Sequence, residues 1–178
     1  LGASGVLADS SAVDFSNGTG TLDLNGYNET VLTVAGSCTT CYITNSASGS
    51  GTNTLTSGTT TTATTFAGVI QDGSTAKVAI TKQGSGSLTL SGANTYSNGT
   101  TLNSGTLKLG ISSSGAPGAV TQGAIGTGSI TIAYNNSSSK YGTLDLNGYT
   151  LSNAIALNGG TITSSTGTST VSGAVTLG

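Results

Sequence analysis

The heptapeptide TLDLNGY occupies residues 21–27 and recurs letter for letter at residues 143–149. In each copy two leucines flank one aspartate, an alternation that places both leucines on one face of a short strand. The Asn-Gly pair that follows is the dipeptide best suited to a sharp turn. A strand-and-turn unit that recurs at long range is typical of repetitive β architectures. We therefore expect both copies to form equivalent rungs of one repetitive β fold.

The same alternation of apolar and polar residues continues along the chain. Its aliphatic pairs are Leu22/Leu24, Leu32/Val34, Val78/Ile80, Leu88/Leu90, Leu107/Leu109, Ile130/Ile132, Leu144/Leu146, Ile155/Leu157 and Val175/Leu177. Glycine or Asn-Gly follows most pairs, and no stretch shows the helical period of about 3.6 residues. The sequence predicts an all-β chain with no significant helix.

The shortness of these strands distinguishes between all-β folds. Strands of sandwiches and barrels usually have about 5 to 6 residues, and conserved aromatic side chains often pack in their cores. Here the strands are shorter, the inward residues are aliphatic, and the turns are rich in Gly, Asn and Ser. Stacked coils fit this pattern, because each coil buries its apolar row only against its neighbours. We predict a parallel β-helix forming a single domain over residues 1–178, with a β-sandwich as the alternative.

Charge and composition exclude several classes of partner. The chain has a formal net charge of −2, and only 6% of its residues are charged. Its four basic residues are Lys77, Lys82, Lys108 and Lys140, which form no basic stripe, so nucleic acid and anionic lipid are not expected partners. No apolar run approaches the roughly 20 residues of a membrane span. The ends lack a signal peptide, so we expect a processed subunit or a segment of a longer protein.

The two cysteines, Cys38 and Cys41, form a CxxC pair. Zinc requires four ligands, and a chain without His and without a second cysteine pair cannot complete such a site. Thioredoxin-like redox centres lie at a helix N-terminus, and no helix is expected here. The sequence favours a disulfide that closes a tight turn in an oxidising compartment, with two unpaired thiols as the alternative.

No set of residues indicates catalysis. The chain has no His, which removes the usual general base of Ser and Cys hydrolases. The acidic residues are Asp9, Asp14, Asp23, Glu29, Asp72 and Asp145, and only the N-terminal Asp9, Asp14 and Glu29 could meet on adjacent coils. Calcium sites need several clustered oxygen ligands. We predict no enzyme, no cofactor and no metal site.

Two surface features remain open. The tyrosines (Tyr27, Tyr42, Tyr96, Tyr134, Tyr141 and Tyr149) either form a carbohydrate-stacking surface or, as we favour, cover the apolar edges of turns. The threonine-rich stretches 56–66 and 166–173 raise the possibility of an ice-binding surface. Their Thr-x-Thr pairs are irregularly spaced along the sequence, so the sequence does not favour ice binding.

Residues 66–110 resemble a known family. The segment contains Phe66, Gly68, Ile70, Asp72-Gly73, Lys82, Gly84, Gly86, Leu88, Leu90, Gly92, Ala93-Asn94, Tyr96, Thr100 and Gly105-Thr106-Leu107. These residues follow the pattern of the autotransporter-associated β-strand repeat of bacterial passenger domains. Asn98 stands where that family often has Gly, and Asn tolerates the same left-handed turn geometry.

The resemblance implies a right-handed β-helix, secreted across the outer membrane of a Gram-negative bacterium and displayed outside the cell. It carries over no catalytic residue. The predicted function is structural, as a passenger stalk or a subunit of an extracellular filament; the alternative is an adhesin with a cell-surface or glycan ligand. The expected partner is another copy joined head to tail through the terminal rungs, or the continuation of a longer parent chain.

Overall fold

The computed structural model describes residues 1–16, 18–58, 61–135 and 140–178. In these ranges the regular structure consists of strands, joined by turns and bends, and there is no helix. The predicted all-β class is confirmed. The same ranges contain no helix that could cross a membrane.

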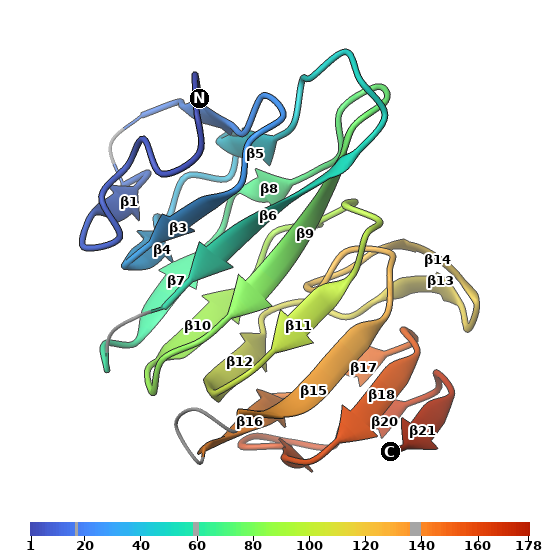
Figure 1. The fold of residues 1–178 in the computed structure, drawn as a ribbon. Helices are drawn as coiled ribbons and strands as arrows, with labels where there is room; N and C mark the ends of the chain where they lie inside the picture. Colours follow the sequence, from blue (N-terminus) through green and yellow to red (C-terminus); the bar gives the residue numbers. More distant parts are fainter. Residues whose placement is uncertain (17, 59–60, 136–139) are drawn as a thin grey trace.

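The largest group of parallel strands forms one face of the molecule, which we call sheet A (Figure 1). Each neighbouring pair in it is parallel. In spatial order its strands are β3 (Glu29–Val31), β6 (Thr52–Ser57), β9 (Lys77–Lys82), β11 (Thr100–Leu102), β15 (Ile130–Asn135), β18 (Ile155–Asn158) and β21 (Val175–Leu177).

Two further groups of parallel strands run beside sheet A. Sheet B contains β7 (Thr64–Phe66), β10 (Ser87–Leu90), β12 (Gly105–Leu109), β16 (Lys140–Asp145) and β19 (Thr161–Thr163), and a bridge from Gly36 to Phe66 adds the pair β1 (Ala12–Asp14) and β4 (Thr33–Ala35). Sheet C contains β2 (Thr21–Asp23), β5 (Tyr42–Thr44) and β8 (Val69–Ile70). Nearer the C-terminus, β17 (Thr150–Leu151) pairs with β20 (Thr170–Val171).

The chain visits these sheets in a fixed order. It runs from sheet B to sheet C to sheet A in β1–β2–β3, and repeats this order in β4–β5–β6 and β7–β8–β9. We call each such passage a coil; the later coils begin at β10, β12, β16 and β19. Successive coils stack, so the two chain ends lie at opposite ends of the molecule (Figure 1).

Two antiparallel hairpins interrupt the stacking. Strands β13 (Ser114–Ala116) and β14 (Ala119–Gln122) pair with each other and project from the side of the molecule (Figure 1). The C-terminal end of β15 and the N-terminal end of β16 also pair with each other in antiparallel orientation, with Tyr134 opposite Tyr141. Both hairpins lie where the chain passes between sheets.

The core is the stacked row of inward aliphatic side chains that the alternation predicts. Leu88 lies in register with Leu107, and Leu107 with Leu144. The predicted inward leucines Leu88, Leu90, Leu107, Leu109, Leu144 and Leu146 are all buried. The predicted register is therefore confirmed for these strands.

One of the predicted aliphatic pairs is wrong, and a second has the predicted orientation but is not buried. Leu32 lies between two strands, β3 and β4, because the chain passes there from sheet A to sheet B; Val31 and Val34 are buried instead. Val175 and Leu177 are in register with the sheet, but they are 47% and 75% exposed because no further strand covers β21 among the described residues.

The two copies of the heptapeptide share a local structure but not a location. Residues 21–23 form β2 of sheet C, whereas residues 143–145 belong to β16 of sheet B. The expectation of equivalent rungs is therefore wrong. The turn geometry is nevertheless the same, since Asn25 and Asn147 have φ values of 47° and 49°.

Candidate functional site

The residues that carry the family resemblance point into the core. Most side chains at its fixed positions are at most 3% exposed, although Asp72, Ala93 and Thr106 are partly buried. The deeply buried side chains are Phe66, Ile70, Lys82, Leu88, Leu90, Asn94, Tyr96, Thr100 and Leu107. A residue buried this deeply contacts other parts of the chain and not an external ligand. The motif therefore describes how coils pack.

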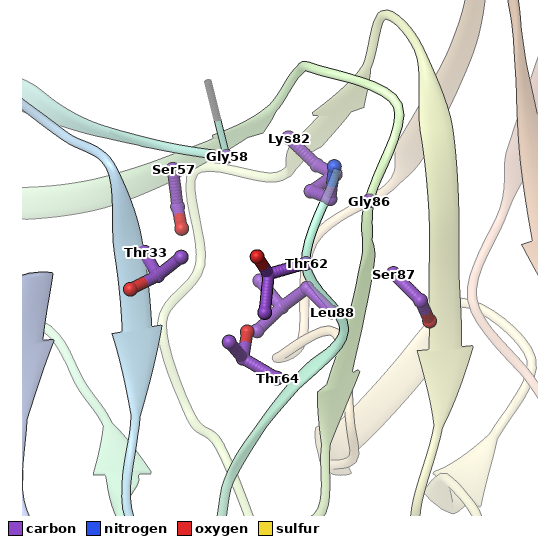
Figure 2. Close-up of a pocket in the computed structure, with 9 residues that line it drawn as sticks. All are labelled: Thr33, Ser57, Gly58, Thr62, Thr64, Lys82, Gly86, Ser87 and Leu88. Atoms are coloured by element: carbon purple, nitrogen blue, oxygen red, sulfur yellow. The ribbon is translucent and has the colours of Figure 1, made fainter. Parts of the chain in front are cut away.

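Lys82 is the unexpected member of this set, because lysine is rarely buried without an ionic partner. It is 1% exposed, at the end of β9. Figure 2 shows its side chain among the residues that line a small cavity: Thr33, Ser57, Gly58, Thr62, Thr64, Gly86, Ser87 and Leu88. The cavity volume of about 10 Å³ is room for about one water molecule.

The amino group of Lys82 lies where three coils meet. Its Nζ donates hydrogen bonds to the carbonyl oxygens of Gln83 at 2.6 Å and Gly84 at 3.2 Å, in its own coil. A Cβ built on Gly58 of the preceding coil would lie 2.9 Å from Nζ, and one on Gly105, the first residue of the coil that begins at β12, would lie 3.0 Å away. Backbone carbonyls therefore replace the missing anion, and glycines make the space for the amine.

Burial lowers the pKa of Lys82 to about 8. An unfolded lysine titrates near pH 10.4, so between about pH 8 and 10 the unfolded chain holds a proton that the folded chain has lost. Stability must therefore rise with pH in this window, by up to about 1.4 kcal/mol per pH unit. We expect the free energy of unfolding, from denaturant titrations, to increase by about 2 kcal/mol between these limits.

The control for this pH dependence is Lys82→Met, which keeps the length of the side chain and removes the titrating amine. The variant is expected to show no such rise. Measurements stop at pH 10 because of Tyr96, whose pKa in the folded chain is raised by burial. Above this pH the tyrosine ionises in the unfolded chain but not in the folded one, which lowers the free energy of unfolding. The same rise in both proteins would contradict the assignment to Lys82.

Asn94 and Tyr96 tie neighbouring coils together. The Asn94 side chain accepts a hydrogen bond from the Ile70 amide at 2.7 Å and donates one to the Ala124 carbonyl at 2.6 Å. The Tyr96 hydroxyl lies 2.7 Å from Oγ1 of Thr100 in its own coil, and the Tyr96 backbone carbonyl accepts a hydrogen bond from the Thr127 amide of the next coil at 2.9 Å. These buried polar groups were not recognised individually from the sequence; their only signal was their fixed place in the repeat pattern.

Three of the candidate acids bind a serine of the following coil, and each serine donates through its backbone amide and its hydroxyl. The pairs are Asp23–Ser46, Asp72–Ser97 and Asp145–Ser165. Desolvation opposes the charged form of Asp23 and Asp145. The hydrogen bonds from the serine and from the asparagine two residues on, together with a nearby positive charge, outweigh it, so the pKa of both carboxyls is lowered. These carboxylates join coils.

The N-terminal acids do not assemble into a site. Glu29 is 2% exposed, and its Oε2 accepts hydrogen bonds from the amides of Val6 at 3.0 Å and Leu7 at 3.3 Å. Asp14 accepts a hydrogen bond from the Ser16 amide at 2.8 Å. Within the described ranges, no three His, Cys, Asp or Glu side chains are grouped so as to hold a metal ion.

Cys38 and Cys41 lie in the connection between β4 and β5, and the structure joins them in a disulfide with a Cα–Cα distance of 5.6 Å. Cys41 is 1% exposed, and its carbonyl accepts a hydrogen bond from Val69 at 2.9 Å in the next coil. The bond closes a small loop beside a coil-to-coil contact.

We predict that this disulfide is intramolecular in the isolated protein. Because the loop is short, the bond restricts the unfolded chain little, and reduction should lower stability only modestly. Mass spectrometry of non-reduced, alkylated protein measures the pairing directly. Two alkylated thiols, or a bond to another chain, would contradict the prediction; the Cys38→Ser/Cys41→Ser double variant serves as the reference for an absent bond.

The tyrosines divide into two groups. Tyr96 is buried and Tyr149 packs against the core, as expected for side chains that cover apolar surface. Tyr27, Tyr42, Tyr134 and Tyr141 are 37–58% exposed. The rings of Tyr134 and Tyr141 contact each other across the β15–β16 hairpin, with centroids 4.8 Å apart and planes tilted by 38°.

Comparison with known proteins agrees with the motif. Residues 80–109 match the model of a family described as the passenger-associated-transport-repeat. The match is shorter than the stretch 66–110 that carries the resemblance and covers the segment from β9 to β12. Comparisons with curated proteins and with solved structures gave no match. The resemblance to a passenger-domain repeat is thus confirmed over residues 80–109, where the match lies.

Proposed function

We propose that this chain is a structural segment of a secreted passenger protein, folded as a right-handed parallel β-helix and acting outside the cell as a stalk or filament subunit. The observation that carries the proposal is the burial of the residues at the fixed positions of the repeat. Such a repeat supplies packing between coils. The proposed role is therefore mechanical and not enzymatic.

The order of the strands supports the helical part of this proposal. Seven successive strands of sheet A are parallel, and each is reached after a strand of sheet B in the same coil. A chain that returns to the same sheet in the same direction advances along one axis, as a solenoid does. Inward polar groups such as Asn94 satisfy backbone atoms where sheet C is interrupted.

The exposed strand β21 supports end-to-end stacking. Its unpaired edge and its exposed Val175 and Leu177 form a surface that a further coil would cover. The opposite end is different: residues 1–11 form no strand, and the amides of Val6 and Leu7 donate hydrogen bonds to the Glu29 carboxylate. The covering coil comes from the same parent chain or from another copy.

Electron microscopy and analytical ultracentrifugation of the purified chain at neutral pH test this role. Uniform fibres that lengthen with concentration support the filament subunit. A monomer supports the stalk segment if a second measurement agrees. In that measurement, a longer chain with further coils must form an elongated rod whose length grows in proportion to the number of coils. A compact particle whose length does not grow with added coils would overturn the structural proposal.

The alternative is an adhesin that binds a glycan, and one observation favours it. The contacting, exposed rings of Tyr134 and Tyr141 offer an aromatic surface of the kind on which sugar rings pack. Glycan-array binding by the wild-type chain that the Tyr141→Ala variant loses would support an adhesin. Tyr27→Ala, at an exposed tyrosine of another coil, is the control.

A further inference from the structure

Sheet A carries a column of threonines in strict register. Thr30 pairs with Thr56, Thr56 with Thr81, Thr81 with Thr101, and Thr101 with Thr131. Ala156 follows, and the column ends at Thr176. We call these residues the threonine column. Neighbouring members are 20 to 30 residues apart in the sequence (101 − 81 and 131 − 101), because the loops between the strands differ in length. The column is therefore irregular in the sequence but regular in the sheet.

The column faces outward. Its threonines alternate with buried residues of the same strands, such as Val31, Ile80 and Ile132. None of the six threonine hydroxyls makes a hydrogen bond to any described residue, whereas the serines that face acids and many other hydroxyls of the chain do. Each free hydroxyl offers one donor and two acceptor positions to the solvent.

The column is regular, stiff and uncharged. Adjacent strands of a sheet are about 4.8 Å apart, which fixes the repeat of the hydroxyl and methyl groups along the column. Threonine is β-branched, so few χ1 rotamers are open to it. Glu29 and Lys82 adjoin the column along these strands, but both side chains are buried on the inward face. The nearest outward charged side chain on these strands is Lys77, four residues from Thr81, and no described element crosses in front of the strands in Figure 1.

Sheet B offers a contrast on the same molecule. Its outward column also contains threonine, but Thr89 lies in register with Lys108, and Lys108 with Asp145. The last two form an ion pair at 3.5 Å. Charges in the middle of that column break the uniform hydroxyl and methyl pattern. A second outward column of sheet B is uncharged but joins only four strands, through Ser87, Thr106, Thr143 and Thr161. The column of sheet A crosses seven strands, and Ala156 is its one residue without a hydroxyl. Among the described strands, the longest uncharged hydroxyl column therefore lies on sheet A.

We propose that the threonine column binds ice. The strand spacing of about 4.8 Å is close to the repeat of equivalent water oxygens along the a axis of hexagonal ice. A row of fixed hydroxyls can join such a lattice, while the methyl groups lie against it. A glycan fits less well, because no aromatic ring belongs to the column. A second copy fits less well too: seven strands give a contact of roughly 300 Å² per partner, far below the usual 800 Å².

The test is ice-affinity partition of the purified chain, with ice grown slowly from dilute protein solution as the probe. Protein in the ice and liquid fractions is quantified, and thermal hysteresis is measured on the same samples. We expect the wild-type chain to be enriched in ice. Thr101→Lys, in the middle of the column, should reduce enrichment and hysteresis to background, and Thr131→Lys gives an independent test if Thr101→Lys fails to fold.

The matched control is Thr106→Lys, which changes a partly buried threonine, like Thr101, in the four-strand column of sheet B. It should leave ice enrichment unchanged. Wild-type protein that is excluded from ice overturns the proposal, as does an equal loss in Thr101→Lys and Thr106→Lys. Loss of self-association in Thr101→Lys without ice enrichment in the wild type would assign the column to a second copy instead. The inference does not depend on the proposed function, since assembly and ice partition are measured separately.

Discussion

Leu107→Asp is expected to abolish cooperative folding of the coils around β12. Leu107 is fully buried between Leu88 of β10 and Leu144 of β16. A carboxylate there would have no partner, and burying it costs several kcal/mol. Since a domain is stabilised by only about 5–15 kcal/mol, a loss of this size removes much of the total. Denaturant unfolding followed by circular dichroism measures it, and hydrogen exchange locates the opened strands.

Thr89→Asp is the matched control for this substitution. Thr89 lies on the outward side of β10, one residue from the buried Leu88, and in register with Lys108. The new carboxylate would stay in water near a cation, so the expected cost is below about 1 kcal/mol. Equal losses for Leu107→Asp and Thr89→Asp would show that the inward and outward assignments are wrong.

Gly92→Ala is expected to be among the most damaging changes of a single methyl group in the repeat. A Cβ built on Gly92 would lie 1.9 Å from the carbonyl oxygen of Gly68, in the backbone of the preceding coil. No side chain can move aside to relieve this contact, so the two coils must separate. Overpacking of this kind usually costs about 1–3 kcal/mol, and a backbone clash belongs at the upper end. Thermal and denaturant unfolding measure the loss.

Gly49→Ala provides the control for the glycine substitution. A Cβ on Gly49 would meet nothing within 4 Å, and neither Gly49 nor Gly92 has a positive φ, so both substitutions change side-chain volume without backbone strain. The expected change for Gly49→Ala is within about 0.5 kcal/mol. If Gly92→Ala is as stable as Gly49→Ala, the close approach of the two coils is not present in solution.

Prediction from the sequence succeeded where neighbouring residues alone decide the structure. The alternation around Leu88, Leu107 and Leu144 fixed which side chains turn inward, because successive side chains of a strand point to opposite faces. It failed at Leu32, where the chain changes sheets between β3 and β4. An alternation gives no information about where one sheet ends and the next begins, since both continue the same extended backbone.

The buried site at Lys82 was less accessible to sequence reasoning. The repeat pattern marked Lys82 and the glycines around it, but not that the amine would be enclosed by backbone of three coils. Gly58 and Gly105 are 47 residues apart (105 − 58) and meet at Lys82 only after stacking. Such contacts depend on the number of residues in each coil. The loops vary in length, so this number cannot be read from the sequence.

The repeated heptapeptide shows what the local sequence determines and what only the tertiary structure decides. By itself the sequence determined the turn: in both copies the aspartate accepts a hydrogen bond from the asparagine amide at 2.9 Å, and asparagine takes the left-handed conformation. These are interactions between residues two positions apart, so seven residues suffice to specify them. Only the tertiary structure decided that one copy belongs to sheet C and the other to sheet B. The sheet depends on which strands the neighbouring coils present for pairing, and in the same way the threonine column exists only because seven strands separated by unequal loops stack in one register.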